Sequence, residues 1–216
     1  MENSSTKQFV MAVVKGNHNN AIKFSPEDAV KLRLTARIHD WGESITGHYD
    51  ITFADKTIQD EEAEHRALQR ILRSKARAVV TNKEDENALV RLVRTVLKEI
   101  ATDRMTKLGK AFNAIERLGY LSTAIKAFEV RPSQDKKVSE GLTWLTTDVL
   151  INQTAMLCSY STLYPPVEEF LQKHKALLSQ AFKTLPENVF HYYKADQREQ
   201  KKKIFSQAKA VWFENF

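Results

Sequence analysis

Residues 36–47, Ala-Arg-Ile-His-Asp-Trp-Gly-Glu-Ser-Ile-Thr-Gly, decide how the rest of the chain is interpreted. An adjacent pair, His39 and Asp40, is followed by Glu43 at helical spacing, where residues three and four apart are neighbours. Imidazole and carboxylate groups are good ligands for divalent metals, and a further carboxylate can accept a proton. The stretch therefore predicts a metal site on a helix, whereas an isolated His-Asp pair on a surface would have no such role.

The helix that carries this pair is predicted to start at Ser25. Ser25 suits the N-cap, Pro26 suits the first helical position, and Asp28 completes an acidic variant of the capping box. Apolar residues at helical spacing then form one stripe, which comprises Val30, Leu34, Ile38 and Trp41, and a second side holds Leu32, Ala36 and His39. A helix with two buried faces is expected in the middle of a bundle.

A chain of 216 residues fits one large domain or two small ones, and we expect a single all-helical domain over residues 1–216. Of the 216 residues 42% are hydrophobic and 28% are charged, and only 6 are Gly and 5 are Pro, so long helices with few tight turns are expected. The single cysteine, Cys158, excludes a disulfide within the chain and fits a reducing compartment. With no signal peptide and no apolar stretch of about 20 residues, we expect a cytoplasmic protein without a membrane segment.

Hydrophobic periodicity predicts further helices along the chain. The expected ranges are 58–77, 84–103, 105–130, 142–163, 167–182 and a basic, amphipathic last helix from 198. Residues 131–137 are expected to be an exposed linker. His65 is expected to take part in surface salt bridges, His174 to lie on the surface, and the very regular helix over 84–103 to carry no chemistry.

The central stretch and the residues after it are similar to the HD superfamily of metal-dependent phosphohydrolases, and most of all to the small helical 5'-deoxynucleotidases. The family pattern is a hydrophobic residue, His-Asp-x-x-Glu, then Thr-Gly-Asp, a Lys-containing loop and an acidic helix. It is matched by residues 38–47, Asp50, Asp55, Lys56 and residues 61–64. The match covers residues 26–72 well and 105–129 loosely. It implies an HD-like helical bundle with a core over about 20–130 and additional C-terminal helices over about 138–216.

The resemblance implies one divalent ion, Mn, Co, Ni, Mg or Fe, held by His39 and Asp40. The family has another histidine ligand earlier in the chain, and His18, in loop-like sequence, is the only histidine upstream here. The family also has a late aspartate, where this chain has Asn113, and Glu116 follows one turn later. Because a carboxylate compensates the ion's charge better than an amide, Glu116 is the stronger candidate. Alternatively, His18 is a solvated loop residue and Glu116 pairs with Lys110 or Lys126.

The same resemblance assigns the chemistry. Glu43 would orient the attacking water and take its proton. His48, which stands where the family has aspartate, or Asp50 would assist the leaving oxygen, unless His48 is only a polar loop residue. Lys56 or Arg37 would neutralise the phosphate.

The expected function is that of a phosphoric monoester hydrolase acting on a nucleoside monophosphate or another small phosphate ester. The net charge of +6 suits anionic partners. The alternative is a catalytically degenerate HD-like protein that binds a nucleotide or a protein partner without turnover, since several family ligands are replaced or displaced. A third reading is a nucleic-acid-binding protein that uses the basic tail at residues 198–203. The oligomeric state, including a homodimer, is left open.

Overall fold

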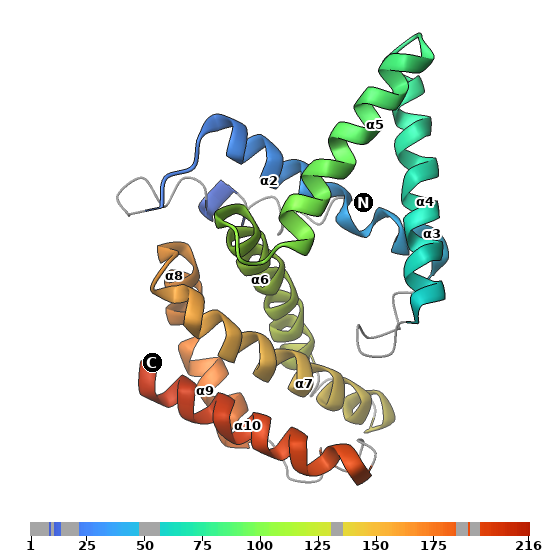
Figure 1. Cartoon of the computed structure of the whole chain (residues 1–216). Helices are drawn as coiled ribbons and strands as arrows, with labels where there is room; N and C mark the ends of the chain where they lie inside the picture. Colours follow the sequence, from blue (N-terminus) through green and yellow to red (C-terminus); the bar gives the residue numbers. More distant parts are fainter. Residues whose placement is uncertain are drawn as a thin grey trace. The chain divides into compact units, whose positions relative to one another are not determined.

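The computed structural model describes residues 9, 11–13, 22–47, 57–130, 136–184, 190 and 195–216, with backbone alone for residues 136–148 and 196. These residues are helical, with short turns between helices, and none of them forms a β-strand (Figure 1). The all-α class predicted from the sequence is confirmed. None of the described helices combines the length and the apolarity that a membrane crossing requires.

The chain divides into two compact units, which we describe one at a time. The first is Pro26–Phe112, and the second comprises Met1–Ser25 and Asn113–Phe216. The boundary falls within one continuous helix, α6 (Lys107–Val130).

Before α6, the described part of the first unit contains α-helices and short helical turns. Its elements are α2 (Pro26–Ile38), a 3-10 turn (His39–Trp41), α3 (Glu43–Thr46), α4 (Ile58–Arg77), α5 (Lys83–Leu97) and a π-helical turn (Lys98–Thr102). Helix α2 begins at Pro26 and α4 spans 58–77, as predicted. Side chains fix where the two long helices start. Thr57 and Asp60 form a reciprocal capping box on α4, and the Asn82 side chain accepts a hydrogen bond from the Asp85 N–H at 2.8 Å on α5.

Helices α4 and α5 run antiparallel, side by side, as a hairpin whose apolar side packs against the end of α2 (Figure 1). The buried members of this core are Ile38, Leu72, Ala76, Val90 and Leu97, and Leu34, Trp41, Leu68, Leu89 and Val93 pack around them. The prediction for Val30 was wrong, since its side chain is exposed while Ala29 and Leu32 take the buried positions at that end of α2.

The second unit contains the remainder of α6, α7 (Lys136–Ser161), α8 (Pro165–Lys173), α9 (Lys175–Thr184) and α10 (Ala195–Asn215). Helix α10 packs along α7, and its Trp212 is fully buried. The Trp212 indole stacks on Phe216 and Phe182, with ring centroids 4.7 Å and 6.1 Å away, and its Nε1 donates to the Ser179 hydroxyl at 3.0 Å. Aromatic stacking and one satisfied polar group therefore anchor the last helix.

Two buried polar side chains of this unit have raised pKa values. Burial raises the pKa of the Cys158 thiol to about 11 and that of the Tyr164 hydroxyl to about 12, because the low-dielectric interior disfavours the ionised form. The Tyr164 hydroxyl has no hydrogen-bond partner among the described residues, and its ring stacks on Tyr160 with centroids 6.2 Å apart.

Several predicted helix boundaries were wrong. The regular helix after Asn82 ends at Leu97 and gives way to the π-helical turn, and α7 begins at Lys136, within the segment expected to be a linker.

The single helix expected over 167–182 is two helices, because His174 leaves helical geometry with φ −102° and ψ 8°. Its N–H is shared by the carbonyls of Phe170 and Leu171, both at 3.2 Å, and its ring lies 4.7 Å from that of Phe170. The ring is half-buried, and burial, followed by the neighbouring Lys173 charge, lowers the pKa of His174.

Candidate functional site

His39 and Asp40 lie where helix α2 ends. The α-helix stops at Ile38, and His39, Asp40 and Trp41 form the 3-10 turn that leads into α3. Gly42 explains the break, because it is buried against α4. A Cβ at this position would lie 2.5 Å from the backbone oxygen of Glu64. The chain must tighten here for α3 to pack on α4, so the pair sits at a change of direction rather than within the uninterrupted helix that was predicted.

The His39 imidazole is held from three directions. Its Nδ1 lies 3.2 Å from the backbone oxygen of Thr35, its ring meets that of Phe112 edge-on at 5.0 Å, and its Nε2 lies 3.0 Å from Oδ1 of Asp40. The His39 side chain is 17% exposed and that of Asp40 is 57% exposed. The His39 ring is thus held by contacts with the protein, while the Asp40 carboxylate is accessible to solvent.

These contacts constrain the protons on the ring. A backbone carbonyl only accepts hydrogen bonds, so Nδ1 carries a proton when it bonds to Thr35. Nε2 then faces the Asp40 carboxylate either as a second N–H, in an imidazolium ion, or as a lone pair. Two lone pairs that face each other at 3.0 Å require a cation between them.

A divalent ion fits this pair of atoms. Two neighbouring ligands that each lie about 2.1 Å from one octahedral ion are about 3.0 Å apart. The distance from His39 Nε2 to Asp40 Oδ1 is compatible with that value, and it is also the length of an ordinary N–H···O hydrogen bond. Histidines that bind metals commonly donate their other ring N–H to a backbone carbonyl, as the contact with Thr35 allows. The two side chains therefore suit part of a coordination sphere.

The other predicted residues divide into three groups. His18, His48, Asp50 and Lys56 lie outside the described residues. Glu43 begins α3 beside the pair, and Arg37 is exposed in the last turn of α2.

Asn113 and Glu116 belong to the second unit. There, the buried Asn113 amide donates to the Tyr160 hydroxyl at 2.7 Å, and Glu116 accepts from Tyr120 at 3.5 Å. Their convergence with His39 and Asp40 stays a prediction. Within the described part of the chain, no three His, Cys, Asp or Glu side chains come together as a metal-binding group.

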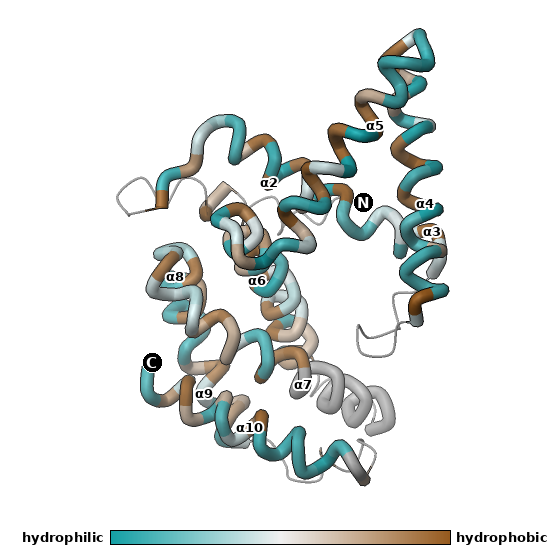
Figure 2. Tube along the Cα trace, viewed as in Figure 1, coloured by the Kyte–Doolittle hydropathy of each residue, from teal (hydrophilic) through white to brown (hydrophobic). Residues whose placement is uncertain are grey.

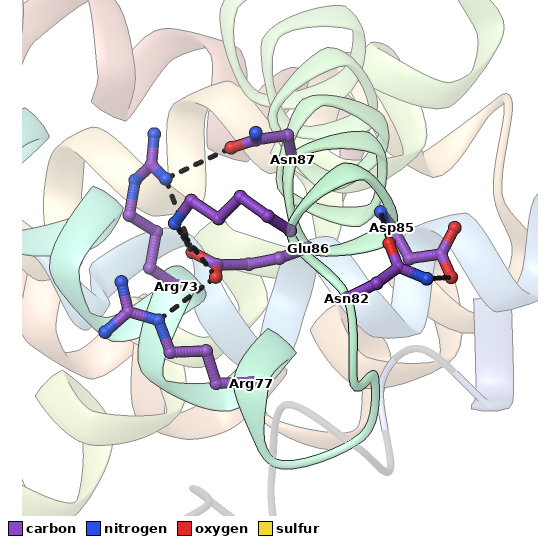
Figure 3. Close-up of polar contacts among 7 residues, drawn as sticks. Arg73, Arg77, Asn82, Asp85, Glu86 and Asn87 are labelled. Atoms are coloured by element: carbon purple, nitrogen blue, oxygen red, sulfur yellow. Dashed lines mark hydrogen bonds and ion pairs between the residues drawn. The ribbon is translucent and has the colours of Figure 1, made fainter.

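The sequence did not predict a buried carboxylate on α5. The Glu86 side chain is 5% exposed and is surrounded by cations, as Figure 3 shows. It accepts hydrogen bonds from Arg77 Nε at 3.1 Å, from Lys83 Nζ at 3.0 Å and from Arg73 Nη1 at 3.3 Å. Arg73 also donates to the Asn87 side chain at 3.2 Å. The Arg77 and Lys83 hydrogen bonds lower the pKa of Glu86 to about 2. Only Lys83 lies at helical spacing from Glu86, and a charged pair in an amphipathic helix is usually solvated, whereas Arg73 and Arg77 come from α4 through the packing of the hairpin.

His65 also has a definite partner in this hairpin. The Arg94 guanidinium donates to its Nε2 at 2.8 Å. His65 therefore joins α4 to α5, near the exposed face where it was expected.

Comparisons with known proteins give no family assignment, since no family model, no curated protein and no solved structure matches the chain.

Proposed function

We propose that the chain is a metal-dependent phosphohydrolase of the HD type, acting on a nucleoside monophosphate or another small phosphate ester. One observation carries the proposal: His39 Nε2 and Asp40 Oδ1 are 3.0 Å apart, while His39 Nδ1 faces the Thr35 carbonyl. This arrangement suits two neighbouring ligands of a divalent ion. Glu43, three residues after Asp40 in the chain, begins α3 just after the 3-10 turn and is the candidate proton acceptor.

In this proposal a divalent ion supplies Lewis acidity toward the phosphoryl group. His39, whose ring is fixed by Thr35 and Phe112, and Asp40 would hold it. Glu43 would orient the attacking water and take its proton as the new P–O bond forms. The bond to the leaving oxygen breaks, and His48 or Asp50 would return a proton to that oxygen. Arg37 or Lys56 would neutralise charge on the phosphate.

Metal content and hydrolysis together test the proposal. The purified chain, loaded in turn with Mn, Co, Ni and Mg, would be analysed for bound metal and for phosphate release from nucleoside monophosphates. We expect His39→Ala and Asp40→Ala to lower metal affinity on the order of 100-fold and to abolish hydrolysis. His65→Ala is the matched control, because it removes an imidazole that contacts Arg94 instead.

Each outcome of these experiments leads to a different conclusion. If both variants keep the metal and the activity of the native chain, the site is wrong. If the chain binds metal and nucleotide but releases no phosphate, the proposal of a hydrolase gives way to that of an HD-like protein that binds a nucleotide without turnover. An NMR titration of His39 adds an independent readout, because bound metal shifts its ring signals and an imidazolium–carboxylate pair alone leaves them unchanged on metal addition.

A further inference from the structure

The α4–α5 hairpin carries basic residues at regular helical intervals. On α4 the spacing is four, three and four residues. From the start of α5 to the first residue of the π-helical turn it is eight, three and four residues, so each set falls on one side of its helix. The first set is Arg66, Arg70, Arg73 and Arg77, and the second is Lys83, Arg91, Arg94 and Lys98. We call the two sets together the basic face. Of the basic residues between 66 and 98, only Lys75 lies outside it.

Contacts across the hairpin show that both sets lie on the same side. Arg94 on α5 reaches His65 on α4. Arg73 on α4 reaches Asn87 on α5, and Arg77 meets Glu86 (Figure 3). These pairs lie between residues 65 and 77 of α4 and between residues 86 and 94 of α5. The buried apolar residues of the hairpin pack instead in the core around Leu72 and Val90, although Leu92 and Ile58 are exposed. Figure 2 shows the alternation of hydrophilic and hydrophobic residues along both helices.

The carboxylates on this side of the hairpin do not neutralise the positive charge of the basic face. Glu62 pairs with Arg66 at 3.2 Å, and Glu86 is shared by three cations. Arg70, Arg91 and Lys98 are exposed and make no ion pair with the residues that the structure describes. Arg77 and Lys83 remain more than 60% exposed despite their contact with Glu86. A concentrated positive charge therefore faces solvent.

We propose that the basic face binds the phosphodiester backbone of a nucleic acid. Six of its eight cations are arginines, whose planar guanidinium groups match phosphate oxygens better than lysine does. From Lys83 in α5 to Lys98 at the start of the π-helical turn the cations extend over 15 residue steps, about 22 Å at about 1.5 Å per residue, which is the length of about six base-pair steps. A single phosphate group would engage only a few of these charges, whereas a polymer of regularly spaced phosphates can engage both rows. The proposal does not depend on the hydrolase site.

Salt-dependent binding of the full chain tests the proposal. Fluorescence anisotropy would follow labelled single-stranded and duplex RNA and DNA of about 20 nucleotides at several salt concentrations. In Arg70→Gln/Arg91→Gln/Lys98→Gln, each lost phosphate contact on duplex DNA should reduce the slope of log affinity against log salt by about 0.9. We expect the slope to fall by about 3 and the affinity at moderate salt to fall more than tenfold. The nucleic acid arm with the steepest native slope identifies the form that binds.

Two further variants keep the result interpretable. Arg70→Lys/Arg91→Lys/Lys98→Arg conserves charge and should keep the native salt slope. Lys202→Gln/Lys203→Gln/Lys209→Gln removes exposed charges from α10 and should bind like the native chain. Circular dichroism confirms that each variant is folded. The proposal is overturned if the native chain binds none of the four nucleic acids, if only the α10 variant loses binding, or if polyglutamate competes as well as nucleic acid does.

Discussion

The Glu86 carboxylate sets the pH dependence of the hairpin. Its pKa falls from 4.5 to about 2 through hydrogen bonds from Arg77 and Lys83, so the folded state favours the ionised form. A carboxyl group whose pKa is lowered by folding stabilises the protein fully above its unfolded pKa, and this stabilisation is lost as the pH falls through the folded pKa. The relevant window therefore runs from about pH 4.5 down to about pH 2.

We expect Glu86→Gln to be less stable than the native chain at pH 7, and the difference to shrink steadily below pH 4.5. The neutral amide leaves the charges of Arg73, Arg77 and Lys83 uncompensated at neutral pH, whereas near pH 2 the native carboxyl is itself becoming neutral. Thermal unfolding of both proteins at pH 7, 4.5, 3 and 2 measures the effect. Glu84→Gln, at an exposed position on the same helix, is the control and should show a smaller difference. A gap for Glu86→Gln that is constant across this range would contradict the assignment.

Two tyrosines of the second unit offer a matched pair. The Tyr164 hydroxyl is buried and lacks a partner among the described residues, whereas the Tyr160 hydroxyl accepts from Asn113 at 2.7 Å. Tyr164→Phe should raise the free energy of unfolding by about 1 kcal/mol, and Tyr160→Phe should lower it by about 1–3 kcal/mol, because it leaves a buried amide unpaired. Urea unfolding gives both values. Equal effects in the two variants would show that the hydroxyls have equivalent surroundings.

At the scale of elements, two glycines flank α3 and restrict it for different reasons. A Cβ at Gly42 would lie 2.5 Å from the Glu64 backbone oxygen of α4, whereas Gly47 has φ +75° with open space around it. Gly42→Ala should therefore lower the free energy of unfolding by about 3 kcal/mol through overpacking, and Gly47→Ala by about 1 kcal/mol through backbone strain.

Asparagine separates the two causes, because it tolerates the left-handed conformation better than alanine. Gly47→Asn should recover part of the stability lost in Gly47→Ala, and Gly42→Asn should be worse than Gly42→Ala. Chemical denaturation of the four variants measures this order. The reverse order would mean that α3 does not pack on α4 through Gly42.

Helix boundaries could be predicted where local chemistry fixes them. Pro26 marks the start of α2, and the acidic start and basic end of α4 agree with its dipole. The breaks at His39 and His174 were not predicted, because the first is followed only by the isolated Gly42, which a helix can tolerate, and the second has no Gly or Pro beside it. The first depends on how closely Gly42 approaches Glu64, and the second accompanies the packing of the His174 ring on Phe170.

At the scale of the whole molecule, each compact unit has its own core. Leu72 belongs to the core of Pro26–Phe112, and Trp212 belongs to that of the other unit. Leu72→Ala should lower the free energy of the opening that permits hydrogen exchange by about 2–5 kcal/mol for backbone amides in α4 and α5. Trp212→Ala should lower it by about 3–5 kcal/mol for backbone amides in α7 and α10. Hydrogen exchange with mass spectrometry locates each effect. If either variant lowers protection equally in both units, the two cores unfold as one.

The candidate site could be predicted from sequence only as far as local spacing reaches. His39, Asp40 and Glu43 are close in the chain, so the sequence alone could name them, but the uninterrupted helix expected through them is broken by the 3-10 turn at His39–Trp41. The position of the Thr35 carbonyl and of the Phe112 ring around His39 depends on how the chain folds back, as does the burial of Glu86 by two arginines of α4. Residues brought together by tertiary packing leave no spacing rule in the sequence, which explains why this cluster went unforeseen.

The buried Cys158 has a practical consequence for studying the protein in solution. Maleimides react with thiolates, and a side chain that is 4% exposed with a pKa of about 11 presents almost none at neutral pH. The native chain should therefore stay unlabelled. A cysteine introduced at an exposed position of α4 or α10 would then carry a dye or a spin probe as the sole reactive group, with no need to remove the natural one.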